Sequence, residues 1–130
     1  MKPKFRAWLK DEYRMTDVRE ITFFDDEVQM ISDVTDFYTY GEFELMQSTG
    51  LIDKNGKEIF EGDIVRYRYK VNGNNLTEVV AYDKDFAGFG VVYEFTDVIF
   101  TFGEMCEDID LSNFVVIGNI YENPELLEEE

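Results

Sequence analysis

Few residues in this chain could carry out catalysis. The sequence contains no histidine and a single cysteine, Cys106. The commonest general base, the usual partner of a nucleophilic serine or cysteine, and the common zinc ligands are therefore missing. Acidic residues on both sides of Cys106 disfavour its thiolate, and no glycine-rich phosphate-binding motif occurs. We predict a protein that is not an enzyme and that carries no cofactor.

Carboxylates are the remaining candidates, because paired Asp and Glu side chains serve glycosidases and bind Mg²⁺ or Ca²⁺. They gather in two clusters, of which the first is Asp25, Asp26 and Glu27 and the second is Glu104, Glu107, Asp108 and Asp110. Neither cluster has the ligand spacing or the central glycine of an EF-hand loop. We interpret both as solvated loops and expect no metal site.

One predicted strand offers a candidate binding site. After Glu61-Gly62-Asp63, the apolar residues Val65, Tyr67, Tyr69 and Val71 alternate with Ile64, Arg66, Arg68 and Lys70. Side chains two positions apart share a strand face, so Arg66, Arg68 and Lys70 are expected to lie together. These cations could contact a protein partner or the phosphates of a nucleic acid. The alternative is that they pair across strands with acids such as Glu78 or Asp83.

The elements that must position this basic face are β-strands. Short aromatic and β-branched runs, separated by turn signals, predict strands over residues 5–9, 20–24, 28–32, 39–47, 63–71, 76–82, 90–95, 98–102 and 114–120. Asn72-Gly73-Asn74-Asn75 favours a hairpin turn after the basic strand, and Asn55-Gly56 indicates a second turn. Gly88-Phe89-Gly90 is also interpreted as a turn.

The last part of the chain is less regular. Residues 103–112 could form a loop or a short helical turn. Gly118 suggests a bend or bulge in the closing strand. Asn123 can cap a helix that begins with Pro124 and Glu125, so a short C-terminal helix is predicted over residues 124–128.

Charge limits the partners that the protein can have. The 130 residues include 29 acids and 12 basic residues, for a net charge of −17, and Lys84 is the only base after residue 70. Nucleic acids and anionic membranes repel such a chain, whereas a basic protein partner, or solubility alone, fits the charge. No signal peptide or membrane-spanning apolar run is recognisable, and a lone cysteine does not indicate disulfides. We therefore expect a cytoplasmic protein.

Three stretches carry a longer pattern: residues 4–8 (KFRAW), 46–51 (MQSTGL) continuing through 53–65 (DKNGKEIFEGDIV), and 116–127 (VIGNIYENPELL). In this order they resemble the motifs of the YopX family of phage and prophage proteins. Ser48 and Ile52 stand where the pattern has an aromatic and a polar residue. The resemblance implies a mainly β fold, to which the residues themselves add the short C-terminal helix. An SH3-like barrel over residues 46–130 would follow a smaller β-rich region over residues 1–45. No activity and no functional residue come with the resemblance.

Three functions therefore compete. We favour a phage or prophage accessory protein that acts in the cytoplasm of the bacterial host, binds another protein and forms a homo-oligomer. The acidic charge favours a basic partner, and in an extreme form the acids would imitate DNA. The second function is nucleic-acid binding through Arg66, Arg68 and Lys70, which the net charge disfavours. The least favoured is an enzyme that uses carboxylates alone.

Overall fold

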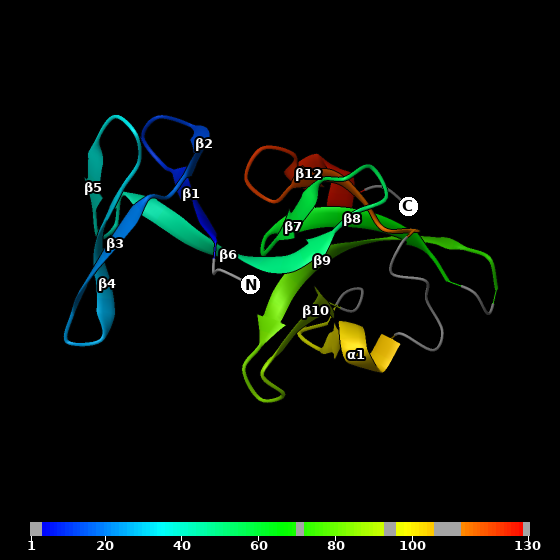
Figure 1. Cartoon of the computed structure of the whole chain (residues 1–130). Coiled ribbons are helices and arrows are strands. Elements are labelled where there is room, and N and C mark those ends of the chain that lie inside the picture. The colour runs from blue at the N-terminus through cyan, green and yellow to red at the C-terminus, as the bar shows by residue number, and fades with distance from the viewer. Residues whose placement is uncertain (1–3, 70–71, 93–95, 106–112, 129–130) are drawn as a thin grey trace. The chain divides into compact units, whose positions relative to one another are not determined.

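β-strands make up most of the chain in the computed structural model, which describes residues 4–69, 72–92, 96–105 and 113–128 (Figure 1). The prediction of a mainly β protein is confirmed. Contacts divide the chain into two units, Met1–Ser48 and Thr49–Glu130. Strand β6 (Phe43–Ile52) runs across this boundary. None of the helices in the described ranges has the length and apolar character needed to span a membrane.

In the first unit, strand β1 (Phe5–Leu9) lies between β2 (Arg14–Asp17) and β6. Both pairings are antiparallel, and Trp8 faces Met15 on one side and Glu44 on the other. The order of this sheet is β2-β1-β6-β7, and its last strand, β7 (Glu58–Phe60), belongs to the second unit. Ala7 and Leu9 of β1 are buried and belong to the hydrophobic core of the unit.

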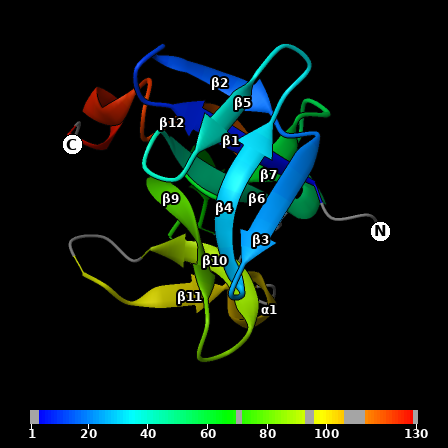
Figure 2. The same cartoon turned by 90° about the vertical axis from the view of Figure 1, so that its left-hand side faces the viewer.

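A second sheet in this unit consists of β3 (Glu20–Phe24), β4 (Glu27–Ser32) and β5 (Phe37–Thr39), which lie side by side in Figure 2. Asp25 and Asp26 connect β3 to β4, and both have positive φ (50° and 67°). A two-residue hairpin turn of type I′ requires this conformation at both positions, and Asp tolerates it better than most residues do. The register shifts between Thr22 and Phe23, which marks a β-bulge.

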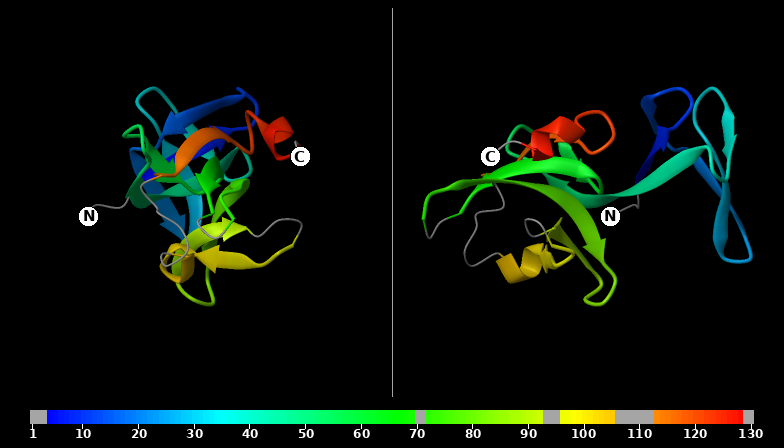
Figure 3. Two further views of the ribbon diagram at one scale, coloured as in Figure 1. Left: turned by 90° about the vertical axis from the view of Figure 1, so that its right-hand side faces the viewer. Right: turned by 180° about the vertical axis from the view of Figure 1, so that it is seen from behind.

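The second unit is built around a five-stranded antiparallel sheet with the order β11-β10-β9-β8-β12. Its strands are β8 (Asp63–Arg68), β9 (Asn75–Asp83), β10 (Gly88–Val92), β11 (Ile99–Thr101) and β12 (Val115–Asn119). The views of Figure 3 show the strong curvature of β9. The short strand β7 (Glu58–Phe60), the single helical turn α1 (Phe102–Met105) and the 3₁₀ helix η2 (Pro124–Leu127) complete the unit.

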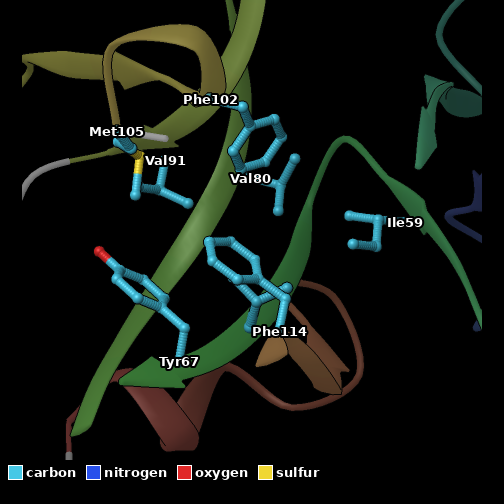
Figure 4. Packing of buried hydrophobic residues seen from close by; sticks show 8 residues of the cluster. Ile59, Tyr67, Val80, Val91, Phe102, Met105 and Phe114 are labelled. Atoms are coloured by element: carbon cyan, nitrogen blue, oxygen red, sulfur yellow. The ribbon is translucent and has the colours of Figure 1, made fainter. Parts of the chain in front are cut away.

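The core of this unit lies on the inner face of the curved sheet, and three aromatic rings pack together in it (Figure 4). Phe114 is 1% exposed, and its ring stacks on Tyr67 with the centroids 4.5 Å apart. Phe102, the first residue of α1, packs edge-on against the same ring at 5.5 Å. Aromatic pairs in these two geometries are favourable beyond the area they bury. Phe114 therefore joins the sheet to α1.

Several predicted boundaries are corrected by the structure. The segment predicted as one strand over residues 39–47 is divided, because Gly41 (φ 94°) turns the chain between β5 and β6. The basic strand ends at Arg68, because the Tyr69 N–H donates to the Asn74 carbonyl across the turn (2.9 Å). Residues 70–71 lie outside the described ranges. β2, β5 and β7 were not predicted as separate strands, whereas the limits of β1 and β3 agree with the prediction.

The interpretation of Gly88-Phe89-Gly90 as a turn is wrong. These residues open strand β10, and the turn is formed by residues 84–87, where Ala87 has a φ of 52°. A Cβ atom at Gly90 would overlap the Phe100 carbonyl oxygen of β11. This glycine is therefore required by the close approach of a neighbouring backbone, which local sequence does not reveal.

Candidate interaction surface

Arg66 and Arg68 both lie exposed on the outer face of β8. Arg66 faces Val115 of β12 on one side and Thr77 of β9 on the other, and Arg68 faces Asn75. Because the two arginines are separated by one residue on a strand, their Cα atoms are about 7 Å apart. The structure thus confirms that these two cations share a face. The third predicted member, Lys70, lies outside the described residues.

The two guanidinium groups have few partners. Arg66 Nε donates to Thr77 Oγ1 at a long 3.4 Å. Arg68 extends toward the following turn, where a Cβ on Gly73 would lie 3.3 Å from Arg68 Nη2. Within the described parts of the chain, neither arginine forms an ion pair. Both cations are therefore open to an external anion.

For Arg66 and Arg68, the alternative prediction of pairing with Glu78 or Asp83 is wrong. Glu78 faces Val65 in the register of β8 and β9, so its side chain lies on the inner face, where it is 5% exposed. Its carboxylate accepts a hydrogen bond from the Tyr67 hydroxyl. Asp83 lies beyond the last β8–β9 pair, opposite Gly88, and its Oδ1 accepts from the Asp85 N–H.

The buried Tyr67 hydroxyl is a group that sequence reasoning missed. Burial raises the pKa of Tyr67 far above its ordinary value, and the hydrogen bond to Glu78 adds to the rise. The available signal was the alternation of Leu76, Glu78 and Val80, which puts the glutamate on the apolar face of β9. Because its hydroxyl is a hydrogen-bond donor held inside the core, Tyr67 has a structural role.

The carboxylates in the central motif bind backbone N–H groups. Asp53 is 6% exposed, and its Oδ1 accepts from Asn55 (2.9 Å) and Lys57 (2.8 Å). Its Oδ2 accepts from the Val116 N–H of β12 at 2.9 Å, so one side chain joins a turn to a distant strand. Burial alone would raise the pKa of Asp53, but these backbone hydrogen bonds lower it below the ordinary value. Asp63 is also buried, and its Oδ2 accepts from the Phe60 N–H (2.8 Å).

The terminal motif is structural as well. Asn119 Oδ1 accepts from the N–H groups of Tyr121 and Glu122 at 3.0 and 2.9 Å. The register of β12 shifts between Val116 and Gly118, which confirms the predicted bulge. The sequence suggested that the Asn123 side chain caps the C-terminal helix. In the structure this side chain does not cap η2. Its Oδ1 accepts from the Asn119 N–H instead (3.2 Å), and the predicted helix is a 3₁₀ helix that ends at Leu127.

The two acidic clusters have local structural roles where they are described. Asp25 and Asp26 form the β3–β4 turn. Thr101 and Glu104 form a capping box at α1: Glu104 Oε1 accepts from the Thr101 N–H (3.1 Å), and Thr101 Oγ1 accepts from the Glu104 N–H (3.3 Å). The other members, Glu107, Asp108 and Asp110, lie outside the described residues, as does Cys106. No group of three acidic, Cys or His side chains that could hold a metal ion occurs among the described residues.

One buried acid in the first unit was not singled out in the sequence. Asp33 accepts hydrogen bonds from the N–H groups of Thr35 and Asp36 (both 2.8 Å) and from the Thr16 hydroxyl (2.8 Å). Burial alone would raise the pKa of Asp33, but these hydrogen bonds lower it well below its ordinary range. The Asp33-Val34-Thr35-Asp36 run has the composition of an Asx turn, which was the available signal.

Comparison with known proteins agrees with the resemblance that the sequence motifs indicated. The family profile described as "YopX protein" matches residues 4–128. The crystal structure of protein EF1440 from Enterococcus faecalis is similar to this chain, with a TM-score of 0.69 and 34% sequence identity over 98% of this chain and 99% of that one. None of the curated proteins matches. The resemblance inferred from the three motifs is thereby confirmed, and the chain belongs to the YopX family.

Proposed function

We propose that the protein is a non-catalytic interaction module and that Arg66 and Arg68 contact a protein partner. One observation carries this proposal: both guanidinium groups are exposed, and neither is paired with an acid in the described chain. Acids outnumber basic residues 29 to 12, so acidic side chains are plentiful in this molecule. Two arginines that form no ion pair with any of these acids in the described chain are suited to bind an anionic group on another molecule.

The chemistry of arginine determines what the pair would bind. A guanidinium group can donate two parallel hydrogen bonds to one carboxylate, and two such groups on one strand face select a partner with two acidic side chains. Most of the protein repels an acidic partner, so the contact would be confined to this face. The local positive charge would then fix the orientation in which the partner approaches.

The structural role of the buried carboxylates supports a protein that is not an enzyme. Asp53 and Asp63 bind backbone N–H groups, and the chain has no histidine to act as a general base. The YopX resemblance supports a phage or prophage accessory protein in the bacterial cytoplasm. It also supports an SH3-like barrel for the second unit, for which the curvature of the five-stranded sheet is a further argument. Self-association into a homo-oligomer stays a prediction.

Affinity purification from phage-infected bacteria tests the proposal. The tagged wild-type protein is compared with an Arg66→Glu/Arg68→Glu variant and with Arg19→Glu, since Arg19 is also exposed and forms no ion pair within the described chain. We expect the wild type and Arg19→Glu to retain the same protein and the double variant to lose it. Equal retention by all three proteins would contradict the proposal.

A second candidate function rests on the same arginines. Guanidinium groups that are free of acids can bind phosphates, and such binding weakens steeply as salt rises. A gel shift at low salt with single- and double-stranded DNA and RNA tests this function. Retardation that disappears in Arg66→Glu/Arg68→Glu but persists in Arg19→Glu would favour nucleic-acid binding over a protein partner. No retardation of the wild type would eliminate it.

A further inference from the structure

Exposed hydrophobic side chains are concentrated in one part of the first unit. Eight large hydrophobic residues in the described chain are more than 60% exposed, and five of them lie between residues 23 and 40. These five are Phe23, Phe24, Val34, Phe37 and Tyr40. Single exposed hydrophobic residues need no explanation, but several close together indicate an interaction site.

The register of the β3-β4-β5 sheet shows which of these side chains share a face. Ile21, Ile31 and Tyr38 face one another across the three strands and pack into the core. Side chains on the neighbouring positions therefore point to the opposite face. By this register the outer face carries Phe24 of β3, Met30 of β4 and Phe37 of β5, one from each strand. Phe24 is 67% exposed and Phe37 is 68% exposed.

Carboxylates accompany these apolar side chains in the sequence, whereas the two arginines that approach the sheet, Arg14 and Arg19, precede β3. Residues 20–39 contain six acids and neither lysine nor arginine. Four of the acids are Glu20, Asp25, Asp26 and Glu27, whose carboxylates bind no other residue within the described chain. Glu20 and Glu27 lie on the same outer face as Phe24. Solubility would explain the acids, but it does not explain the phenyl rings beside them.

We propose that the outer face of the β3-β4-β5 sheet is a docking surface for a protein segment in which basic and apolar side chains alternate. The phenyl rings of Phe24 and Phe37 would supply the buried area, as aromatic anchors do at interfaces. The carboxylates of Glu20 and Glu27 would select lysine or arginine and reject acidic segments. The surface belongs to the first unit, whereas Arg66 and Arg68 belong to the second, and it selects the opposite charge, so it does not depend on the function proposed for them.

Binding of a labelled peptide of alternating lysine and leucine to the full chain, followed by fluorescence anisotropy, tests this surface. We expect Phe24→Ala/Phe37→Ala to weaken binding about tenfold or more, since aromatic anchors commonly carry most of an interface's affinity. The matched control is Phe86→Ala, because Phe86 is 73% exposed in the turn between β9 and β10. Glu27→Gln is expected to weaken binding more than Glu125→Gln, which alters an exposed glutamate of η2.

Two results would overturn the proposal. The first is binding that the Phe24→Ala/Phe37→Ala variant retains, or that Phe86→Ala weakens equally. The second is self-association of the wild type, measured by sedimentation velocity, that disappears in the same double variant. In that case a second copy of this chain occupies the face, and a basic segment does not. Circular dichroism must show that the variants keep the wild-type spectrum, which is expected because both phenyl rings are largely exposed.

Discussion

Replacement of Asp53 by asparagine removes a charge while it preserves the shape of the side chain. In the native protein the carboxylate accepts three backbone hydrogen bonds, from Asn55, Lys57 and Val116. An amide has only one oxygen, so its NH₂ group must face at least one of these N–H donors. In the best orientation the amide oxygen keeps the bonds to Asn55 and Lys57, and the contact with Val116 becomes repulsive.

The expected loss of stability follows from these three hydrogen bonds. Leaving one buried N–H without an acceptor costs about 1–3 kcal/mol, and a neutral acceptor weakens each of the other two bonds by about 1 kcal/mol. We therefore expect Asp53→Asn to lower the free energy of unfolding by about 3–5 kcal/mol. Since small domains are stable by about 5–15 kcal/mol, the change is large enough to measure easily.

Urea unfolding followed by circular dichroism measures this difference, with Asp97→Asn as the control at an exposed acid. The control is expected to change stability by less than about 0.5 kcal/mol. The pH dependence supplies a second test. Because the folded-state pKa of Asp53 is lowered, its contribution is present above the unfolded pKa of about 4 and is lost as the pH falls below it. The difference between wild type and Asp53→Asn should therefore shrink in acid. A variant as stable as wild type at pH 7, or a difference independent of pH, would refute the reasoning.

Three further predictions concern the second unit. Gly90→Ala should destabilise the protein by about 1–3 kcal/mol in urea unfolding, because its Cβ would overlap the Phe100 carbonyl oxygen; an unchanged midpoint would contradict the close approach of the two strands. Phe114→Ala should cost about 3–5 kcal/mol in the same assay, since it leaves a cavity in the aromatic core. Tyr67→Phe should cost about 1–2 kcal/mol at pH 7 through loss of the hydrogen bond to Glu78. Because the folded-state pKa of Tyr67 is raised, its contribution to stability is present below the unfolded pKa of about 10 and is lost as the pH rises above it. The stability difference between wild type and Tyr67→Phe should therefore narrow in alkaline solution. A difference that stays constant would count against the buried hydrogen bond between Tyr67 and Glu78.

Local sequence predicted those parts of the fold that depend on local rules. Short runs of aromatic and β-branched residues located β1 and β3, and Asn55-Gly56 correctly indicated a turn, since Gly56 has a φ of 84°. Gly118 correctly indicated a bulge, because glycine accommodates the irregular pairing of β12 with β8. These features need only the residue and its immediate neighbours.

Other features were not predictable, because they depend on residues far apart in the sequence. Gly90 resembles a turn residue in the local sequence, and only the close approach of β11 to its backbone explains why glycine is needed there. The alternation of Leu76, Glu78 and Val80 puts Glu78 on the apolar face of β9, but only the register of β8 and β9 puts its carboxylate beside Tyr67. The same register leaves Arg66 opposite Thr77, so the candidate site consists of cations without acids, which composition alone could not establish.

Site-specific photocrosslinking tests the central claim most directly. A benzoylphenylalanine residue placed at the exposed position of Asn75, which faces Arg68 across the β8–β9 pair, reports what contacts this surface in phage-infected cells. Our account predicts a covalent adduct with a protein, and it predicts that the adduct disappears when Arg66→Glu and Arg68→Glu are introduced. An adduct that persists in the presence of both substitutions, or the absence of any protein adduct, would contradict it.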